Sequence, residues 1–138
     1  MSIDISHPWA RSGSLFVDSV RQPRVAGFMT LANRGTEADR LLAAASPVAE
    51  KVEIHGIKVV GPGIAMLPLE KGVALPADTT ITLRPRGYHL MMEGLKAPMS
   101  KGQRISVTLT FEKAGPRQID LTVEDDGPVG NETLAEKT

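Results

Sequence analysis

The sequence predicts an all-β protein, an antiparallel β-sandwich with Greek-key connections. Several short segments alternate apolar and polar residues with a period of two, which is typical of strands that bury one face. The 13 glycines and 10 prolines punctuate these segments, and no long stretch shows the 3.6-residue period of a helix. At 138 residues the chain is one domain that can fold without disulfides or metals.

The first seven candidate strands are short apolar segments separated by turn residues. In chain order they are residues 7–12, 25–33, 40–46, 49–60, 63–69, 80–85 and 88–95. The turns between them are rich in Gly, Pro, Asn and Asp, the residues that tight turns favour. The third candidate has a helical alternative over residues 37–45, which Pro47 would end.

The last two strands show the clearest alternation. Residues 104–112 place Ile105, Val107, Leu109 and Phe111 on one face, and residues 118–124 repeat the pattern. The segment "KAGPR" between them predicts a hairpin turn. The domain therefore covers residues 1–124, and the polar segment 125–138 is expected to be a mobile tail.

Composition excludes several classes of function. The 16 basic and 16 acidic side chains cancel, so the chain lacks the positive field that nucleic acid requires. Cysteine is absent, which removes thiolate nucleophiles, Cys-type zinc sites and the usual blue-copper centre. The most apolar run, residues 41–49, is too short to insert across a bilayer. The N-terminus lacks the apolar core of a signal peptide, so an exported protein would have lost its leader.

His55 and Met66 form the first candidate pair of metal ligands. Val52 and Ile54 share one face of their strand, so His55 points to the other face. Ten residues separate His55 from Met66, with the turn at 61–63 between them. A hairpin at this turn would bring the two side chains together.

His89 and Met91 form the second candidate pair. Residues two apart on a strand point the same way, which puts His89, Met91 and Glu93 on one face of segment 88–95. Tyr88, Leu90 and Met92 then form the packing face. Because His89 and Met91 lie roughly 7 Å apart along the strand, their side chains could converge on one ion.

Two imidazoles and two thioethers make a soft, neutral ligand set that suits Cu(I) better than Ca²⁺, Mg²⁺ or structural Zn²⁺. Packing is the alternative, because methionine commonly fills gaps in cores and strand histidines are often structural. Either pair alone would favour packing, and composition does not decide between the two interpretations.

The other candidates carry less chemistry. We interpret His7 as structural or surface, Met29 as core and Met99 as part of a loop. The carboxylates, including Glu53 and Glu93, are scattered as solvated charges normally are, and no hydrolase motif pairs a serine with a histidine and an acid. The sequence therefore predicts a binding protein and not an enzyme.

The candidate ligands resemble the motif of the PCu(A)C family of periplasmic copper chaperones. That motif runs His, ten residues, Met, about twenty-one residues, His, any residue, Met; His55, Met66, His89 and Met91 match it with twenty-two residues in the middle interval. The segments "HPWARS", "VAGFMTLANRG", "GYHLMMEGLKAPMSKGQ" and "LTFEKAG" also look like family segments. The resemblance covers roughly residues 5–124.

The resemblance implies a cupredoxin-like β-sandwich that carries one Cu(I) per chain to the binuclear copper A centre of cytochrome c oxidase. It implies a periplasmic location and, as partner, an oxidase subunit or its thiol-bearing assembly factor. Residues 56–57 supply no additional Met and the tail has no His/Met-rich extension, which leaves one copper site. We expect a monomer. The rival interpretation is a β-sandwich interaction module in which these residues only pack.

Overall fold

The computed structural model describes residues 3–17, 20–85, 87–95 and 99–125, and they form ten strands. The strands are β1 (Ile3–Val17), β2 (Val20–Asn33), β3 (Asp39–Ala45), β4 (Lys51–Val60), β5 (Gly63–Pro68), β6 (Val73–Leu75), β7 (Thr79–Leu83), β8 (His89–Glu93), β9 (Arg104–Phe111) and β10 (Gly115–Asp125). The all-β prediction is confirmed, and the segment with a helical alternative is β3. The predicted tail lies outside the described residues, apart from Asp125. No helix in the described part of the chain is long and apolar enough to cross a bilayer.

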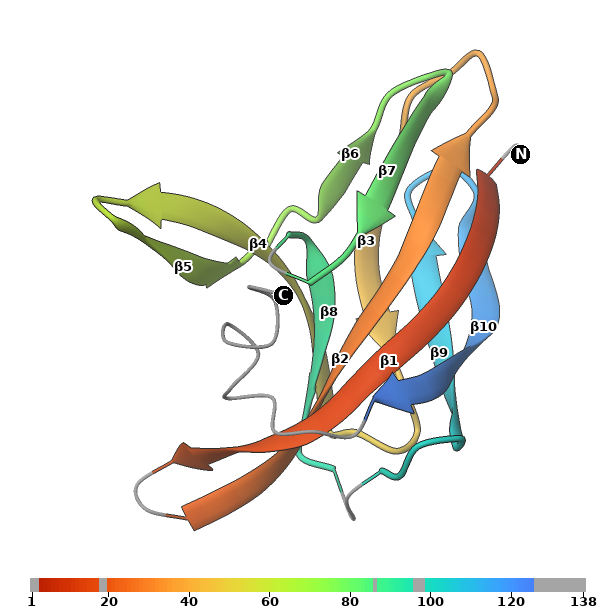
Figure 1. Ribbon diagram of the computed structural model, residues 1–138. Coiled ribbons are helices and arrows are strands. Elements are labelled where there is room, and N and C mark those ends of the chain that lie inside the picture. Colours follow the sequence, from red (N-terminus) through yellow and green to blue (C-terminus); the bar gives the residue numbers. More distant parts are fainter. Residues whose placement is uncertain (1–2, 18–19, 86, 96–98, 126–138) are drawn as a thin grey trace.

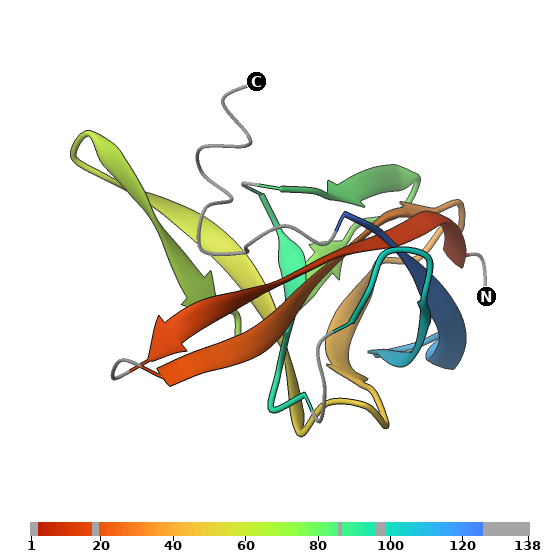
Figure 2. The same cartoon turned by 60° about the horizontal axis from the view of Figure 1, so that its bottom comes forward.

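The strands form one continuous sheet that curls on itself (Figure 1; Figure 2). The order is β5-β4-β8-β2-β1-β10-β9-β3-β6, and β7 pairs with β2 beside β8. The recorded pairs are antiparallel with one exception, because β1 runs parallel to β10. The sheet is therefore mixed, whereas the sequence predicted an antiparallel one. The β4–β5 hairpin projects from the body of the curled sheet (Figure 1).

The main hydrophobic core lies inside the curl. The predicted alternation of β9 is confirmed, because Ile105, Val107, Leu109 and Phe111 are all buried and the residues between them are not. Met29, predicted to be a core residue, is also buried in this cluster. Burial of a large apolar side chain contributes about 1.5–3 kcal/mol, so the buried side chains of β9 and β2 stabilise the curled sheet.

Strand β8 is buried on both of its faces. Leu90 and Met92 pack in the main core, as predicted. His89 and Met91 point to the opposite face and are buried as well, with 2% and 7% of their surface exposed. Tyr88 is 40% exposed, so its predicted place on the packing face is wrong. The chain turns from Arg84 to Tyr88 before the strand begins, and strand alternation does not extend into a turn.

Asp39 joins the start of β3 to the turn between β9 and β10. Its buried carboxylate accepts hydrogen bonds from the N–H groups of Arg40 at 2.7 Å, Lys113 at 2.8 Å and Ala114 at 3.0 Å. Burial alone would raise the pKa of Asp39, but these N–H groups hold its pKa below the ordinary value. The ionised carboxylate is therefore part of the fold.

Replacing Asp39 with asparagine is expected to lower the free energy of unfolding by roughly 1.5–3 kcal/mol at neutral pH, because the charged acceptor is lost. A lowered folded-state pKa stabilises the protein above the unfolded value of about 3.9, and that stability disappears as pH falls through the folded pKa. Urea unfolding should thus show a wild-type advantage at pH 7 that shrinks near pH 3. Asp120→Asn, at an exposed position of β10, is the control. A difference in unfolding free energy between the wild type and Asp39→Asn that did not change with pH would contradict a structural role for the ionised carboxylate.

Candidate metal centre

The structure brings His55 and His89 together on the face of the sheet that points away from the main core. The two residues are directly opposite each other in the antiparallel pair of β4 and β8. Their ring centroids lie 5.4 Å apart with an interplanar angle of 63°. Metal–nitrogen bonds are roughly 2 Å long, so one ion can contact both rings at this separation.

The imidazole of His89 is fixed in one tautomer. Its Nδ1 lies 3.0 Å from the carbonyl oxygen of Gly87, which can only accept, so Nδ1 carries the hydrogen. Burial lowers the pKa of His89, which keeps the ring neutral at neutral pH. The lone pair is then on Nε2, a buried atom with no hydrogen-bond partner among the described residues.

In His55 the roles of the two ring nitrogens are exchanged relative to His89. Its Nε2 lies 3.0 Å from a carboxylate oxygen of Glu53, and its Nδ1 is the buried atom without a described partner. Hydrogen bonds from His55 and Lys51 lower the pKa of Glu53, so that the carboxylate is ionised and accepts. Buried polar atoms normally find partners. Two adjacent imidazoles with one unsatisfied ring nitrogen each are what a soft metal ion would require.

Met91 lies on the same face as His89, two residues along β8. In the sheet it is opposite Glu53 of β4 and Ala26 of β2. It forms a second apolar cluster with Ala26 and Phe28, and Trp9 packs against this cluster. The Phe28 ring also approaches His89, with 6.3 Å between centroids. The Met91 side chain is therefore held in an apolar cluster next to the ring of His89.

Met66 is in β5, where its backbone pairs with Ile57. His55 is opposite Pro68 in the same hairpin, which makes position 66 a diagonal neighbour of position 55. The predicted hairpin is confirmed. The side chain of Met66 lies outside the described residues, so its place in the ligand set stays a prediction.

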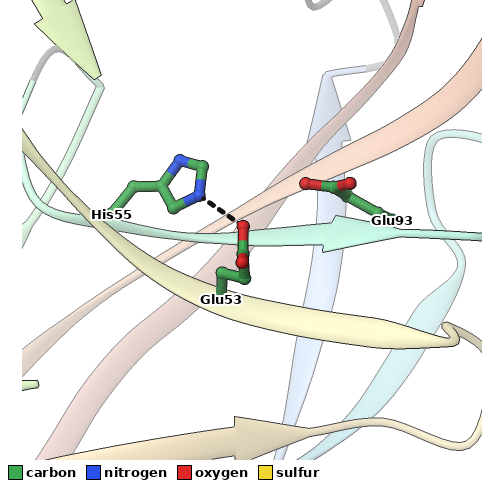
Figure 3. Close-up of side chains that lie close together, drawn as sticks. All are labelled: Glu53, His55 and Glu93. Atoms are coloured by element: carbon green, nitrogen blue, oxygen red, sulfur yellow. Dashed lines mark hydrogen bonds and ion pairs between the residues drawn. The ribbon is translucent and has the colours of Figure 1, made fainter. Parts of the chain in front are cut away.

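Glu53 and Glu93 flank the centre, and their interpretation as scattered solvated charges is wrong. One ligand atom from each of Glu53, His55 and Glu93 lies within 4.8 Å of the others (Figure 3). Glu53 is 3.0 Å from the ammonium of Lys51 and Glu93 is 3.5 Å from the guanidinium of Arg24. Both carboxylates thus have cationic partners already. The two-residue period of a strand could have identified them, since Glu53 is two residues from His55 and Glu93 two from Met91.

The remaining candidates lie away from the centre. His7 is a surface residue, with 70% of its side chain exposed and Nε2 4.0 Å from Glu124. Met99 is in a loop, as predicted, and it packs partly buried against the main core. Neither residue contributes to the paired imidazoles.

Comparison with solved structures identifies the fold. A copper-bound PCuAC domain from PmoF2 is 26% identical, with a TM-score of 0.69 and coverage of 91% of this chain and 94% of that chain. Cu(I)-bound DR1885 from Deinococcus radiodurans is 25% identical, with a TM-score of 0.64 and coverage of 88% and 78%. The predicted cupredoxin-like β fold is thereby confirmed, and the chain has the fold of PCuAC domains.

Sequence comparison assigns the family. The chain is 28% identical over 123 residues to "Putative lipoprotein Lxx21020" of Leifsonia xyli subsp. xyli, a match that covers 89% of this chain and 70% of the relative. A family model described as "Putative lipoprotein LpqE-like" matches residues 3–123, which include both strands that carry the paired histidines. The chain belongs to the LpqE-like family.

Proposed function

We propose that this protein binds one Cu(I) ion and hands it to an acceptor protein outside the cytoplasm. The observation that carries the proposal is the pair of imidazoles at 5.4 Å, each with a buried ring nitrogen that lacks a described partner. The copper-bound and Cu(I)-bound structures of similar domains support copper as the ion. The absence of cysteine makes methionine the available sulfur donor.

The proposed ligands are His55, His89, Met91 and Met66. A neutral set of imidazoles and thioethers stabilises Cu(I) without placing an uncompensated negative charge in an apolar wall. His89 is almost fully buried, whereas 13% of the His55 side chain is exposed. We expect an acceptor's ligand to displace His55 first. Transfer is then a stepwise exchange of ligands and needs no covalent chemistry, consistent with a carrier and not an enzyme.

The location and the acceptor are parts of the same proposal. The lipoprotein names of the family and of the relative support a place in the cell envelope. The resemblance to PCu(A)C chaperones supports the periplasm as compartment and assembly of the copper A centre of cytochrome c oxidase as destination. The partner is an oxidase subunit or its assembly factor, and the protein acts as a monomer.

The test is an anaerobic titration with Cu(I) in competition with a chromogenic Cu(I) chelator, repeated with Zn²⁺ and a Zn²⁺ indicator. We expect one Cu(I) per chain and much weaker binding of Zn²⁺, because thioether sulfur contributes to a soft ion and little to a borderline one. Failure of the chain to compete for Cu(I) would contradict the proposal and leave a β-sandwich interaction module. Equal affinity for Zn²⁺ would contradict the thioether ligands.

A further inference from the structure

We infer that Glu53 is a positioning residue, which holds His55 in the tautomer that presents Nδ1 to the copper ion. The inference rests on the proposed function, because it assigns a role in copper binding. It goes beyond the ligand set, since Glu53 itself has no place among the donors. It also makes a specific statement about each imidazole: His55 binds through Nδ1 and His89 through Nε2.

The first step is the hydrogen bond between His55 and Glu53. Nε2 of His55 lies 3.0 Å from Oε1 of Glu53 (Figure 3). An ionised carboxylate only accepts hydrogen bonds, so Nε2 must carry the hydrogen. A neutral imidazole then has its lone pair on Nδ1, the His55 atom that is buried without a described partner. The carboxylate thus selects which nitrogen is left for the metal.

The second step is that Glu53 is itself held in place. The ammonium of Lys51 lies 3.0 Å from Oε2, the oxygen that His55 does not use. Lys51, Glu53 and His55 follow each other at two-residue spacing on β4, so all three project from one face of the strand. With one oxygen on Lys51 and the other on His55, the carboxylate has little freedom to turn away.

The third step is a contrast between the two histidines. A backbone carbonyl, that of Gly87, orients His89, whereas a side chain orients His55. A carboxylate that accepts from a metal-bound imidazole fixes its orientation and makes it a stronger donor. His55 is also the more exposed of the two rings. The more exposed ring, that of His55, is therefore the one that a side chain orients.

The experiment compares Glu53→Ala and Glu53→Gln with the wild type. Long-range ¹H–¹⁵N spectra of the histidine rings report the tautomer of His55 in the copper-free chain and the nitrogen that shifts on anaerobic loading with Cu(I). We expect a protonated Nε2 and a copper-shifted Nδ1 in the wild type. Glu53→Ala should lose the tautomer preference and bind Cu(I) roughly 10- to 100-fold more weakly. Glu53→Gln should retain the tautomer preference and lose less affinity than Glu53→Ala, because its amide oxygen can accept the same hydrogen bond but carries no charge.

Glu93→Gln is the matched control, since Glu93 is a neighbouring carboxylate that pairs with Arg24, whereas His55 bonds to Glu53. Affinity lost equally in Glu93→Gln and Glu53→Ala would assign the effect to charge and overturn the inference. Unchanged tautomer and affinity in a folded Glu53→Ala would overturn it while leaving the proposed function intact. No Cu(I) binding by the wild type would overturn the proposed function as well, and the spectra of the copper-free chain would still show whether Glu53 sets the tautomer.

Discussion

Replacing Met66 and Met91 together with leucine is expected to abolish retention of Cu(I) while the protein stays folded. Leucine is similar in volume to methionine, so the free energy of unfolding should change by less than about 1.5 kcal/mol. Cu(I) affinity should fall by roughly 100-fold or more, equivalent to about 3 kcal/mol, because both proposed sulfur donors are removed. Competition with a Cu(I) chelator measures the affinity, and urea unfolding measures the stability.

The matched control for this experiment is Met92→Leu. Met92 follows Met91 directly, yet it is buried in the main core on the opposite face of β8. Removal of its thioether should leave Cu(I) affinity unchanged. Wild-type affinity in the Met66/Met91 variant would show that these residues only pack, and the carrier function would lose its chemical basis.

Replacing Gly72 with alanine is expected to destabilise the protein strongly. Gly72 has φ +74°, and a Cβ there would lie 1.8 Å from the carbonyl oxygen of Leu41. The obstacle is backbone of β3, which cannot rotate away as a side chain can. Because Val73 of β6 pairs with Leu41, relief of the clash would pull β6 from the sheet edge. We expect a loss of roughly 3–5 kcal/mol in the free energy of unfolding, measured in urea.

Gly115 separates the two causes of this loss. Its φ of +77° nearly equals that of Gly72, but a Cβ there would meet nothing within 4 Å. Gly115→Ala should therefore show only the strain of a left-handed backbone, about 1–2 kcal/mol. If Gly72→Ala lowered the free energy of unfolding no more than Gly115→Ala, the close approach to β3 would not contribute to the loss.

Strand periodicity is enough to predict which side chains of β8 face the main core and which face the candidate metal centre. Because successive side chains alternate between faces, it separates Met91 from Met92 and places His89 beside Met91, and burial in two different clusters confirms that separation. The turn at 61–63 likewise predicts the β4–β5 hairpin that brings position 66 near position 55. Both predictions depend on local geometry, which a sequence encodes directly.

Features that depend on distant parts of the chain could not be predicted in this way. The parallel pairing of β1 with β10 joins segments from the two ends of the chain, and no local pattern specifies it. The three-residue strand β6 is too short to show a period. Glu53 is a different case, since the spacing was visible but its role depends on a hydrogen bond to His55 that only the folded arrangement reveals.

X-ray absorption at the copper edge of the chain, loaded anaerobically with Cu(I), tests the ligand set most directly. The spectrum distinguishes sulfur from nitrogen or oxygen in the coordination sphere and shows the outer scattering typical of imidazole. We expect both imidazole nitrogen and thioether sulfur, with the sulfur contribution lost when Met66 and Met91 are replaced by leucine. A coordination sphere of nitrogen and oxygen alone, in the wild type, would contradict the proposal that His55, His89 and the two methionines hold the ion.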